Sequence, residues 1–116
     1  MRYLLLIIEP RGQREARNDA EARARYAEMV AFGASLGDKL QASESLRPDL
    51  HGVRVQMQHD KPVLRDGPFA ETKEMVGGFF LLDCTSLEEA VAIAKACPAA
   101  RFATVEVREC APCFAP

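Results

Sequence analysis

The chain has 116 residues, a length that suits one domain and argues against separate catalytic and regulatory domains, so we expect residues 1–116 to form a single unit. Hydrophobic residues make up 48% of the chain and charged residues 28%, as in soluble globular proteins and unlike disordered, fibrous or membrane proteins. The formal net charge of -2 gives no overall field that would attract nucleic acid or an anionic membrane, and we expect neither partner.

The first apolar run covers residues 3–8, and both of its pleat faces are apolar, which predicts a central strand covered on each side. Glu9-Pro10 ends the run, so it is shorter than the core of a secretion signal and than a membrane-spanning helix. We therefore expect a cytoplasmic protein whose four cysteines are reduced thiols.

A long helix is predicted to begin after Asn18. Asn18 and Glu21 have the spacing of a capping box, and apolar residues then recur with helical spacing as far as Leu40. Acidic residues are interleaved with the arginines of this region, which favours a solvated helix face over a basic binding patch. These arginines are Arg11, Arg14, Arg17, Arg23 and Arg25.

A hairpin is predicted next. Residues 43–46 indicate a short extended piece, and strict alternation at residues 53–57 predicts a second strand with one polar face. Residues 62–64 predict a short return strand after a turn. His51 and His59 flank the second strand in polar segments, so we expect them to be exposed to solvent rather than to act as an acid or base.

The last part of the chain predicts a strand, a helix and a strand. Residues 79–82 are apolar on both faces and indicate a second central strand. Ser86 and Glu89 form another capping box, which begins a helix that Pro98 ends, and residues 103–108 alternate as a final strand. The helix residues expected to face inward are Leu87, Ala90, Val91 and Ala94.

The resulting β-α-β-β-α-β order predicts an α+β fold of the ferredoxin-like, split βαβ type, with both helices on one face of the sheet. The two strands that are apolar on both faces would leave the other face uncovered, so we expect a homodimer that stacks there. The same element order occurs in RNA-recognition modules, but Phe79 and Phe80 are adjacent and would point to opposite faces, which disfavours RNA binding.

Between the hairpin and the second central strand lies a polar segment, residues 66–74, that we expect to be a surface loop. One interpretation is structural: Asp66 hydrogen-bonds the amides that follow it, Gly67 adopts a positive φ and Pro68 fixes the next φ. The other is functional: neighbouring carboxylates raise one another's pKa at the mouth of a pocket, and a lysine holds an anionic ligand. The candidate binding residues are Asp66, Gly67, Pro68, Phe69, Glu71, Lys73 and Glu74.

The run Asp66-Gly67-Pro68-Phe69-Ala70-Glu71-Thr72-Lys73-Glu74, followed by Gly77-Gly78-Phe79-Phe80, resembles the signature of the DGPF or YCII-related family. Ser43-Glu44-Ser45-Leu46, Val53-Arg54-Val55 and Glu106-Val107-Arg108 also resemble segments of that family, so the resemblance extends from Tyr3 to Arg108. It implies a ferredoxin-like chain that forms a dimeric α+β barrel. YCII-related enzymes use a histidine–aspartate pair, whereas the predicted first helix here has no histidine, which weakens the enzyme interpretation.

The tail departs from the family pattern. Cys110 and Cys113 have the spacing of a metal-binding or redox pair, but a second pair is missing and prolines surround them. We therefore expect no metal site and no cofactor.

Two functions follow from these features. The first is a small-molecule-binding homodimer with its pocket at the loop of residues 66–74. The alternative is a cofactor-free acid/base enzyme of the lyase or isomerase class, in which Asp66 or Glu71 is the proton acceptor.

Asp66→Asn separates the two interpretations of the loop. An amide still accepts hydrogen bonds but cannot take a proton or balance a lysine, so we expect the free energy of unfolding to change by no more than about 1 kcal/mol. Affinity or turnover for the physiological ligand should fall at least tenfold. Thermal unfolding and ligand titration measure the two effects, and unchanged binding would make the Asp66 carboxylate purely architectural.

Overall fold

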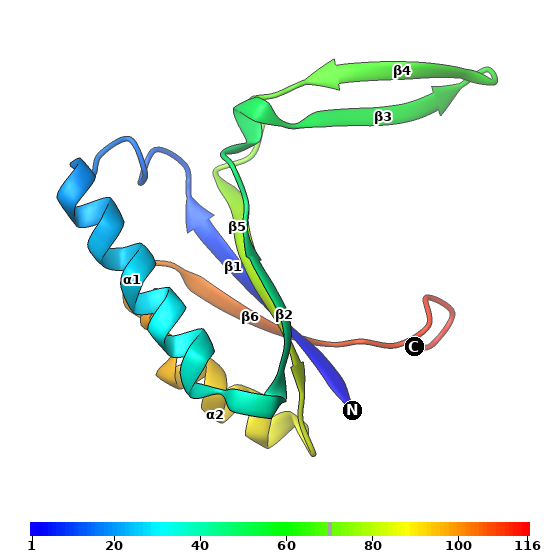
Figure 1. The fold of residues 1–116 in the computed structure, drawn as a ribbon. Coiled ribbons are helices and arrows are strands. Elements are labelled where there is room, and N and C mark those ends of the chain that lie inside the picture. The colour runs from blue at the N-terminus through cyan, green and yellow to red at the C-terminus, as the bar shows by residue number, and fades with distance from the viewer. Residues whose placement is uncertain (70) are drawn as a thin grey trace.

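The computed structural model describes residues 1–69 and 71–116 (Figure 1). Its main elements are β1 (Arg2–Pro10), α1 (Asp19–Ser35), β2 (Leu40–Ser45), β3 (Val53–Gln58), β4 (Lys61–Asp66), β5 (Glu74–Asp83), α2 (Leu87–Ala96) and β6 (Thr104–Glu109). Short 3-10 helices precede β2 (η1, Gly37–Lys39), β3 (η2, Asp49–His51) and β6 (η3, Pro98–Arg101). The α+β class predicted from the sequence is confirmed.

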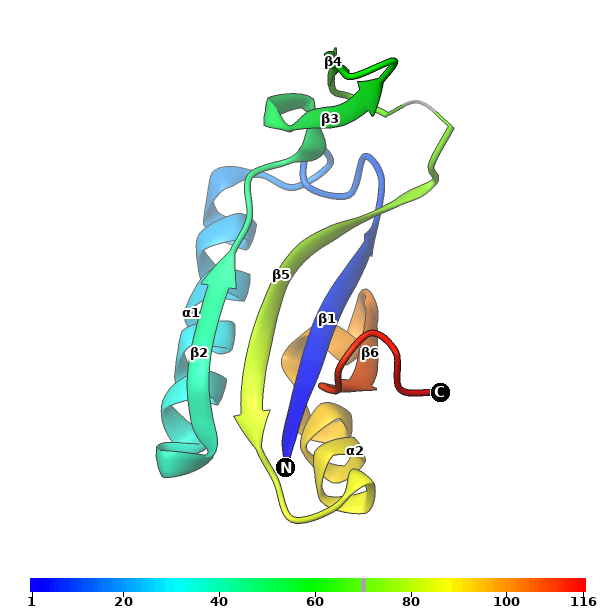
Figure 2. The same ribbon diagram turned by 90° about the vertical axis from the view of Figure 1, so that its right-hand side faces the viewer.

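Four of the strands form one antiparallel sheet in the order β2-β5-β1-β6, as a split βαβ fold requires. β1 is central: its Leu5 lies opposite Phe80 of β5 on one side and Val107 of β6 on the other. Figure 2 shows the two helices behind the sheet and none on the face toward the viewer, where the C-terminal tail lies in front of β6. The prediction that both helices cover one face is therefore confirmed.

The hairpin predicted from residues 53–57 and 62–64 is confirmed as β3 and β4. Its expected place as the second strand of the main sheet is wrong, because that place is taken by β2. β2 has the sequence Leu-Gln-Ala-Ser-Glu-Ser, which carries little apolar alternation because it is an edge strand with mostly exposed side chains. The clear alternation of residues 53–57 belongs instead to β3, which pairs only with β4 in a separate two-stranded sheet.

The core lies between the sheet and the helices. Tyr3, Leu5 and Ile7 of β1 point to this side and are buried. Phe32 of α1 meets Phe80 of β5 edge to face, with ring centroids 5.3 Å apart, an arrangement that suits the charge distribution of aromatic rings. The alternate residues of β1 are half-buried on the open face, so only one face of this doubly apolar strand is covered within the chain.

Both predicted helix N-caps are confirmed. Asn18 Oδ1 accepts a hydrogen bond from the Glu21 amide at 2.8 Å, and Ser86 Oγ accepts one from the Glu89 amide at 3.1 Å. α1 ends at Ser35, short of the predicted Leu40. Ala90 and Ala94 of α2 are buried as predicted, whereas Leu87, in the first turn of α2, is exposed. Neither helix in the described part of the chain has the length and apolar character needed to cross a membrane.

The β3–β4 hairpin, here called the arm (residues 53–66), stands away from the rest of the chain. Every residue of its two strands is exposed. Its turn residues, His59 and Asp60, both have positive φ, of 51° and 63°, as a tight hairpin turn requires. Figures 1 and 2 show the arm projecting from one end of the sheet on the side that carries no helix.

Candidate functional site

The predicted loop, residues 66–74, lies at the root of the arm. A pair of oppositely charged side chains, which the sequence did not indicate, holds this loop in place. The Arg11 guanidinium donates two hydrogen bonds of 2.6 Å to the Asp49 carboxylate. It also donates to the Thr72 carbonyl at 2.9 Å and to the Phe69 carbonyl at 3.3 Å. Hydrogen bonding to Arg11 lowers the pKa of Asp49 below its ordinary value of 3.8, although partial burial opposes this. The loop is therefore anchored to the end of β1.

Asp66 does not cap the turn that follows it. It is the exposed last residue of β4, and within the described part of the chain its carboxylate accepts no hydrogen bond. The Phe69 amide donates instead to Asp49 Oδ2, at 3.4 Å. Gly67 does not have the positive φ that was predicted. Its missing side chain serves close approach, because a Cβ there would lie 1.8 Å from the Asp49 carbonyl oxygen.

Phe69 is the buried centre of the arm's root. The Arg54 guanidinium lies over its ring at 3.6 Å from the centroid, and the Arg65 guanidinium lies at 5.3 Å. Glu71 pairs with both arginines, and hydrogen bonding to Arg65 is the main reason that its pKa is lowered. The Glu71 carboxylate is thus already occupied.

The remaining predicted binding residues are less engaged. Lys73 and Glu74 are exposed, and Lys73 contributes its backbone carbonyl, which accepts a hydrogen bond from the Arg11 amide at 2.9 Å. Pro68 lines a hollow of about 280 Å³ at the root of the arm, together with Arg11 and Asp49. Ala70 of this segment lies outside the described residues. The predicted binding residues thus surround the pair between Arg11 and Asp49, here called the brace. That they also bind a ligand stays a prediction.

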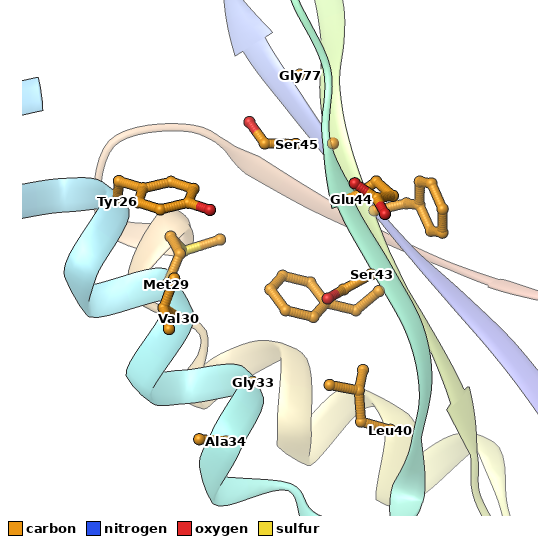
Figure 3. A pocket seen from close by; sticks show the side chains of 13 residues that line it. Tyr26, Met29, Val30, Gly33, Ala34, Leu40, Ser43, Glu44, Ser45 and Gly77 are labelled. Carbon is orange, nitrogen blue, oxygen red and sulfur yellow. The ribbon is translucent and has the colours of Figure 1, made fainter. Parts of the chain in front are cut away.

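A separate cleft lies between α1 and the strands β2 and β5, on the helix-covered side of the sheet (Figure 3). It has two adjoining parts of about 250 and 230 Å³, which share Tyr26, Met29, Ser45 and Gly77. Figure 3 shows Tyr26 and Met29 reaching from α1 toward β2. The first part is otherwise mostly apolar, with Leu40 and Phe80 in its wall, and the second part is strongly charged.

The charged part is built on a buried carboxylate. Glu9 is only 5% exposed, and its Oε1 lies 2.6 Å from Arg14 Nε. Arg14 also donates to the carbonyl oxygens of Leu46, at 2.7 Å, and Gly77, at 3.1 Å. Gly77 is the extra residue in a bulge of β5, and a Cβ there would lie 2.3 Å from Glu9 Oε2. This glycine makes room for the ion pair.

Two further arginines complete the charged part. Arg25 and Arg17 lie over the Phe102 ring, at 3.9 and 5.1 Å from its centroid. Arg17 donates to Gln13 Oε1 at 2.9 Å, but its Nε is buried and has no acceptor among the described residues. Burial and, next, repulsion from Arg25 lower the pKa of Arg17. The cleft therefore holds positive charge that is only partly balanced.

The interpretation of these arginines as a solvated helix face is correct for Arg23 alone, which pairs with Asp19 in solvent. The other arginines have tertiary partners that helical spacing could not reveal. One signal was available: Glu9 continues the period-two alternation of Tyr3, Leu5 and Ile7, which placed its side chain on the buried face. A buried carboxylate requires a cation beside it.

The histidines and cysteines form no cluster. His51 and His59 are exposed, as predicted. Cys84 and Cys97 are buried free thiols whose pKa is raised, first of all by burial, and Cys110 and Cys113 are free and exposed. Within residues 1–69 and 71–116, no three histidine, cysteine, aspartate or glutamate side chains lie close enough together to hold a metal ion.

Comparison with known proteins identifies the family. The family model of the YCII-related domain matches residues 1–113. The chain belongs to this family. An uncharacterised protein of Rhizobium meliloti (strain 1021) is 40% identical to this YCII-related domain over 57 residues, which cover 49% of this chain and 46% of the relative. The domain thus matches about half the length of that relative.

A solved structure shares the fold of this YCII-related domain. It is 5-chloro-2-hydroxyhydroquinone dehydrochlorinase from Burkholderia phenoliruptrix, in complex with 2,5-dihydroxybenzoquinone. The TM-score is 0.57 at 19% sequence identity, and the match covers 96% of this chain and 94% of that chain. The resemblance to the family and the ferredoxin-like fold are therefore confirmed.

Asp49→Asn tests the brace at the root of the arm. Because the pKa of Asp49 is lowered in the folded chain, its carboxylate stabilises the fold above the pKa of the unfolded chain, and this contribution is lost as pH falls through the folded pKa. We expect Asp49→Asn to lower the melting temperature at pH 7 more than Asp66→Asn does. The difference between wild type and Asp49→Asn should shrink below about pH 4. Equal melting temperatures for the two variants at pH 7 would contradict the role of Asp49.

Proposed function

We propose that this YCII-related domain binds a small organic anion in the cleft between α1 and the sheet. Arg17 carries this proposal, because its Nε is buried in the described chain without an acceptor while its positive charge is disfavoured by burial and by Arg25. An anion would supply the missing acceptor and offset the charge. Arg14 does not compete for this role, since Glu9 and two carbonyl oxygens already occupy it.

The other part of the cleft suits the organic portion of such a ligand. Met29, Leu40 and Phe80 provide apolar contacts, and Ser43 and Tyr26 provide hydroxyl groups at its edge. A cavity of about 150 Å³ is enough for benzene, so each part of the cleft has room for one aromatic ring. We therefore expect an aromatic or similarly flat acid.

The structural neighbour offers independent support for this ligand class. The dehydrochlorinase was solved with 2,5-dihydroxybenzoquinone, a single ring whose hydroxyl groups are acidic because each is conjugated with a quinone carbonyl. A ligand of that size and charge matches the dimensions and the positive charge of the cleft in this domain.

Titration of the purified domain with benzoate, 2-hydroxybenzoate and 2,5-dihydroxybenzoquinone tests the proposal. We expect at least one of these acids to bind, and Arg17→Gln to weaken that binding at least tenfold. Arg23→Gln is the matched control. Arg23 is close to Arg17 in the sequence and the variant removes the same charge, but Arg23 pairs with Asp19 in solvent. Isothermal calorimetry measures the affinities. No binding of any acid, or equal binding by Arg17→Gln and wild type, would contradict an anion site here.

We also propose that the domain is a homodimer that packs through its helix-free sheet face. Leu4, Leu6, Phe79 and Leu81 lie side by side on that face and are half-buried, with no element of the described chain over them. Stacking two such faces would remove apolar area from water. The free thiols at Cys84 and Cys97 support a cytoplasmic location for this dimer.

Sedimentation of the wild-type domain at micromolar concentration should give the mass of two chains of 12.8 kDa. Leu6→Lys places a charge at the centre of the proposed interface and should shift the chain to the monomer. A wild-type monomer throughout this concentration range would rule out the homodimer.

The acid/base enzyme is the second candidate, and one observation favours it. Glu9 places a buried carboxylate in the wall of the cleft, where a bound molecule would meet it. Asp66 and Glu71, the proton acceptors expected from the sequence, lie instead at the root of the arm. Chemical change of a bound acid, followed by NMR, would distinguish an enzyme from a binding protein.

A further inference from the structure

One face of the arm is apolar, and nothing in the described chain covers it. Val53, Val55 and Met57 lie on this face of β3, and Leu64 and Pro62 lie opposite Val55 and Met57 on β4. Val55 is 60% exposed, and Met57 and Leu64 are each 65% exposed. Contiguous exposed apolar patches larger than a few hundred Å² mark interaction surfaces in soluble proteins.

The opposite face of the arm is already engaged with its own chain. Arg54 and Arg65 lie on that face, opposite each other in the strand register. Both stack on Phe69 and pair with Glu71. These contacts fix the arm at its root through its polar face and leave the apolar face free.

The direction of the arm indicates where its partner lies. Figures 1 and 2 show the arm projecting at an angle from the sheet on its helix-free side, so that the arm and the open sheet face border the same L-shaped space. The radius of gyration is 16.1 Å, whereas a compact chain of this length has about 13 Å. The chain is therefore extended around a space that a second body can occupy.

The area available favours a second copy of this chain as that body. The apolar residues on the open sheet face are half-buried, so each of them adds less new buried area on stacking than a fully exposed side chain would. A stable dimer buries roughly 800 Å² on each partner, and the arm's apolar side chains are more than half exposed. A two-stranded hairpin is also only marginally stable alone in water. Two-fold symmetry would let each arm cover the other copy in the same way.

We propose that each arm clasps the second copy of the domain, with its apolar face against the partner's body. This inference rests on the proposed homodimer, and it adds that the arm, besides the sheet face, holds the dimer together.

A fluorescent reporter on each face of the arm tests this proposal. The chain contains no tryptophan, so Met57→Trp places a single indole on the apolar face and Gln58→Trp places one on the opposite face. As concentration rises through the dimer Kd, we expect the emission of Met57→Trp to shift to shorter wavelength. The emission of Gln58→Trp should stay at the wavelength of an exposed indole.

Paired lysine substitutions measure how much the arm contributes. Met57→Lys with Leu64→Lys should raise the dimer Kd at least tenfold in analytical ultracentrifugation. Gln56→Lys with Gln58→Lys adds the same charge to the opposite face and should leave the Kd unchanged. All four side chains are exposed in the single chain, so both variants should keep the circular dichroism of the wild type.

The possible outcomes distinguish a failure of the arm's proposed role from a failure of the homodimer on which that role rests. A dimer whose Kd is unchanged by the apolar-face lysines, with a Met57→Trp emission that does not move, would overturn the role of the arm and leave the sheet-face dimer intact. A wild-type chain that stays monomeric at every concentration would overturn both.

Discussion

The bidentate pair between Arg11 and Asp49 holds together three segments that are distant along the chain. Arg11 follows β1, Asp49 begins the turn that leads into β3, and the same guanidinium bonds Thr72 on the way from β4 to β5. The segment that enters the arm and the segment that leaves it are therefore both bound to the Arg11 guanidinium, in a partly buried, charge-assisted contact. The direction of the arm relative to the sheet, and with it the space beside the open face, depends on this contact.

A second ion pair, between Glu9 and Arg14, fixes the charged part of the cleft. Glu9 has room beside β5 because Gly77 lacks a side chain, since a Cβ there would meet the Glu9 carboxylate. β2 can approach β5 because Gly78 lacks one, since a Cβ there would lie 2.8 Å from the Glu44 carbonyl oxygen. The glycine pair thus brings β2 and β5 close together and leaves the carboxylate room to hold Arg14. Since Glu9 balances Arg14, the unbalanced positive charge in the charged part of the cleft comes from Arg17 and Arg25 among the described residues.

Local signals made much of the fold predictable, and long-range contacts account for what was missed. The helix N-caps at Asn18 and Ser86 involve residues three apart, so the sequence alone locates both helix starts. β2 was misplaced because an edge strand needs little apolar alternation, whereas the strongly patterned β3 lies outside the main sheet. The cleft was missed because its arginines take partners from β1, the β5 bulge and the turn before β6. No spacing along the helix encodes those partners.

Because β1 is a central strand, its pairing must wait for parts of the chain that the ribosome makes later. Both neighbours of this strand come from the second half of the chain, since Leu5 pairs with Phe80 and Val107. At about 5–20 residues per second, a ribosome needs several seconds after making β1 to deliver β5, whereas a hairpin closes within microseconds. The arm can therefore form while the central strand still waits unpaired. Throughout that interval the nascent chain presents an apolar hairpin and an open apolar strand together, and it is most vulnerable to aggregation before β5 emerges.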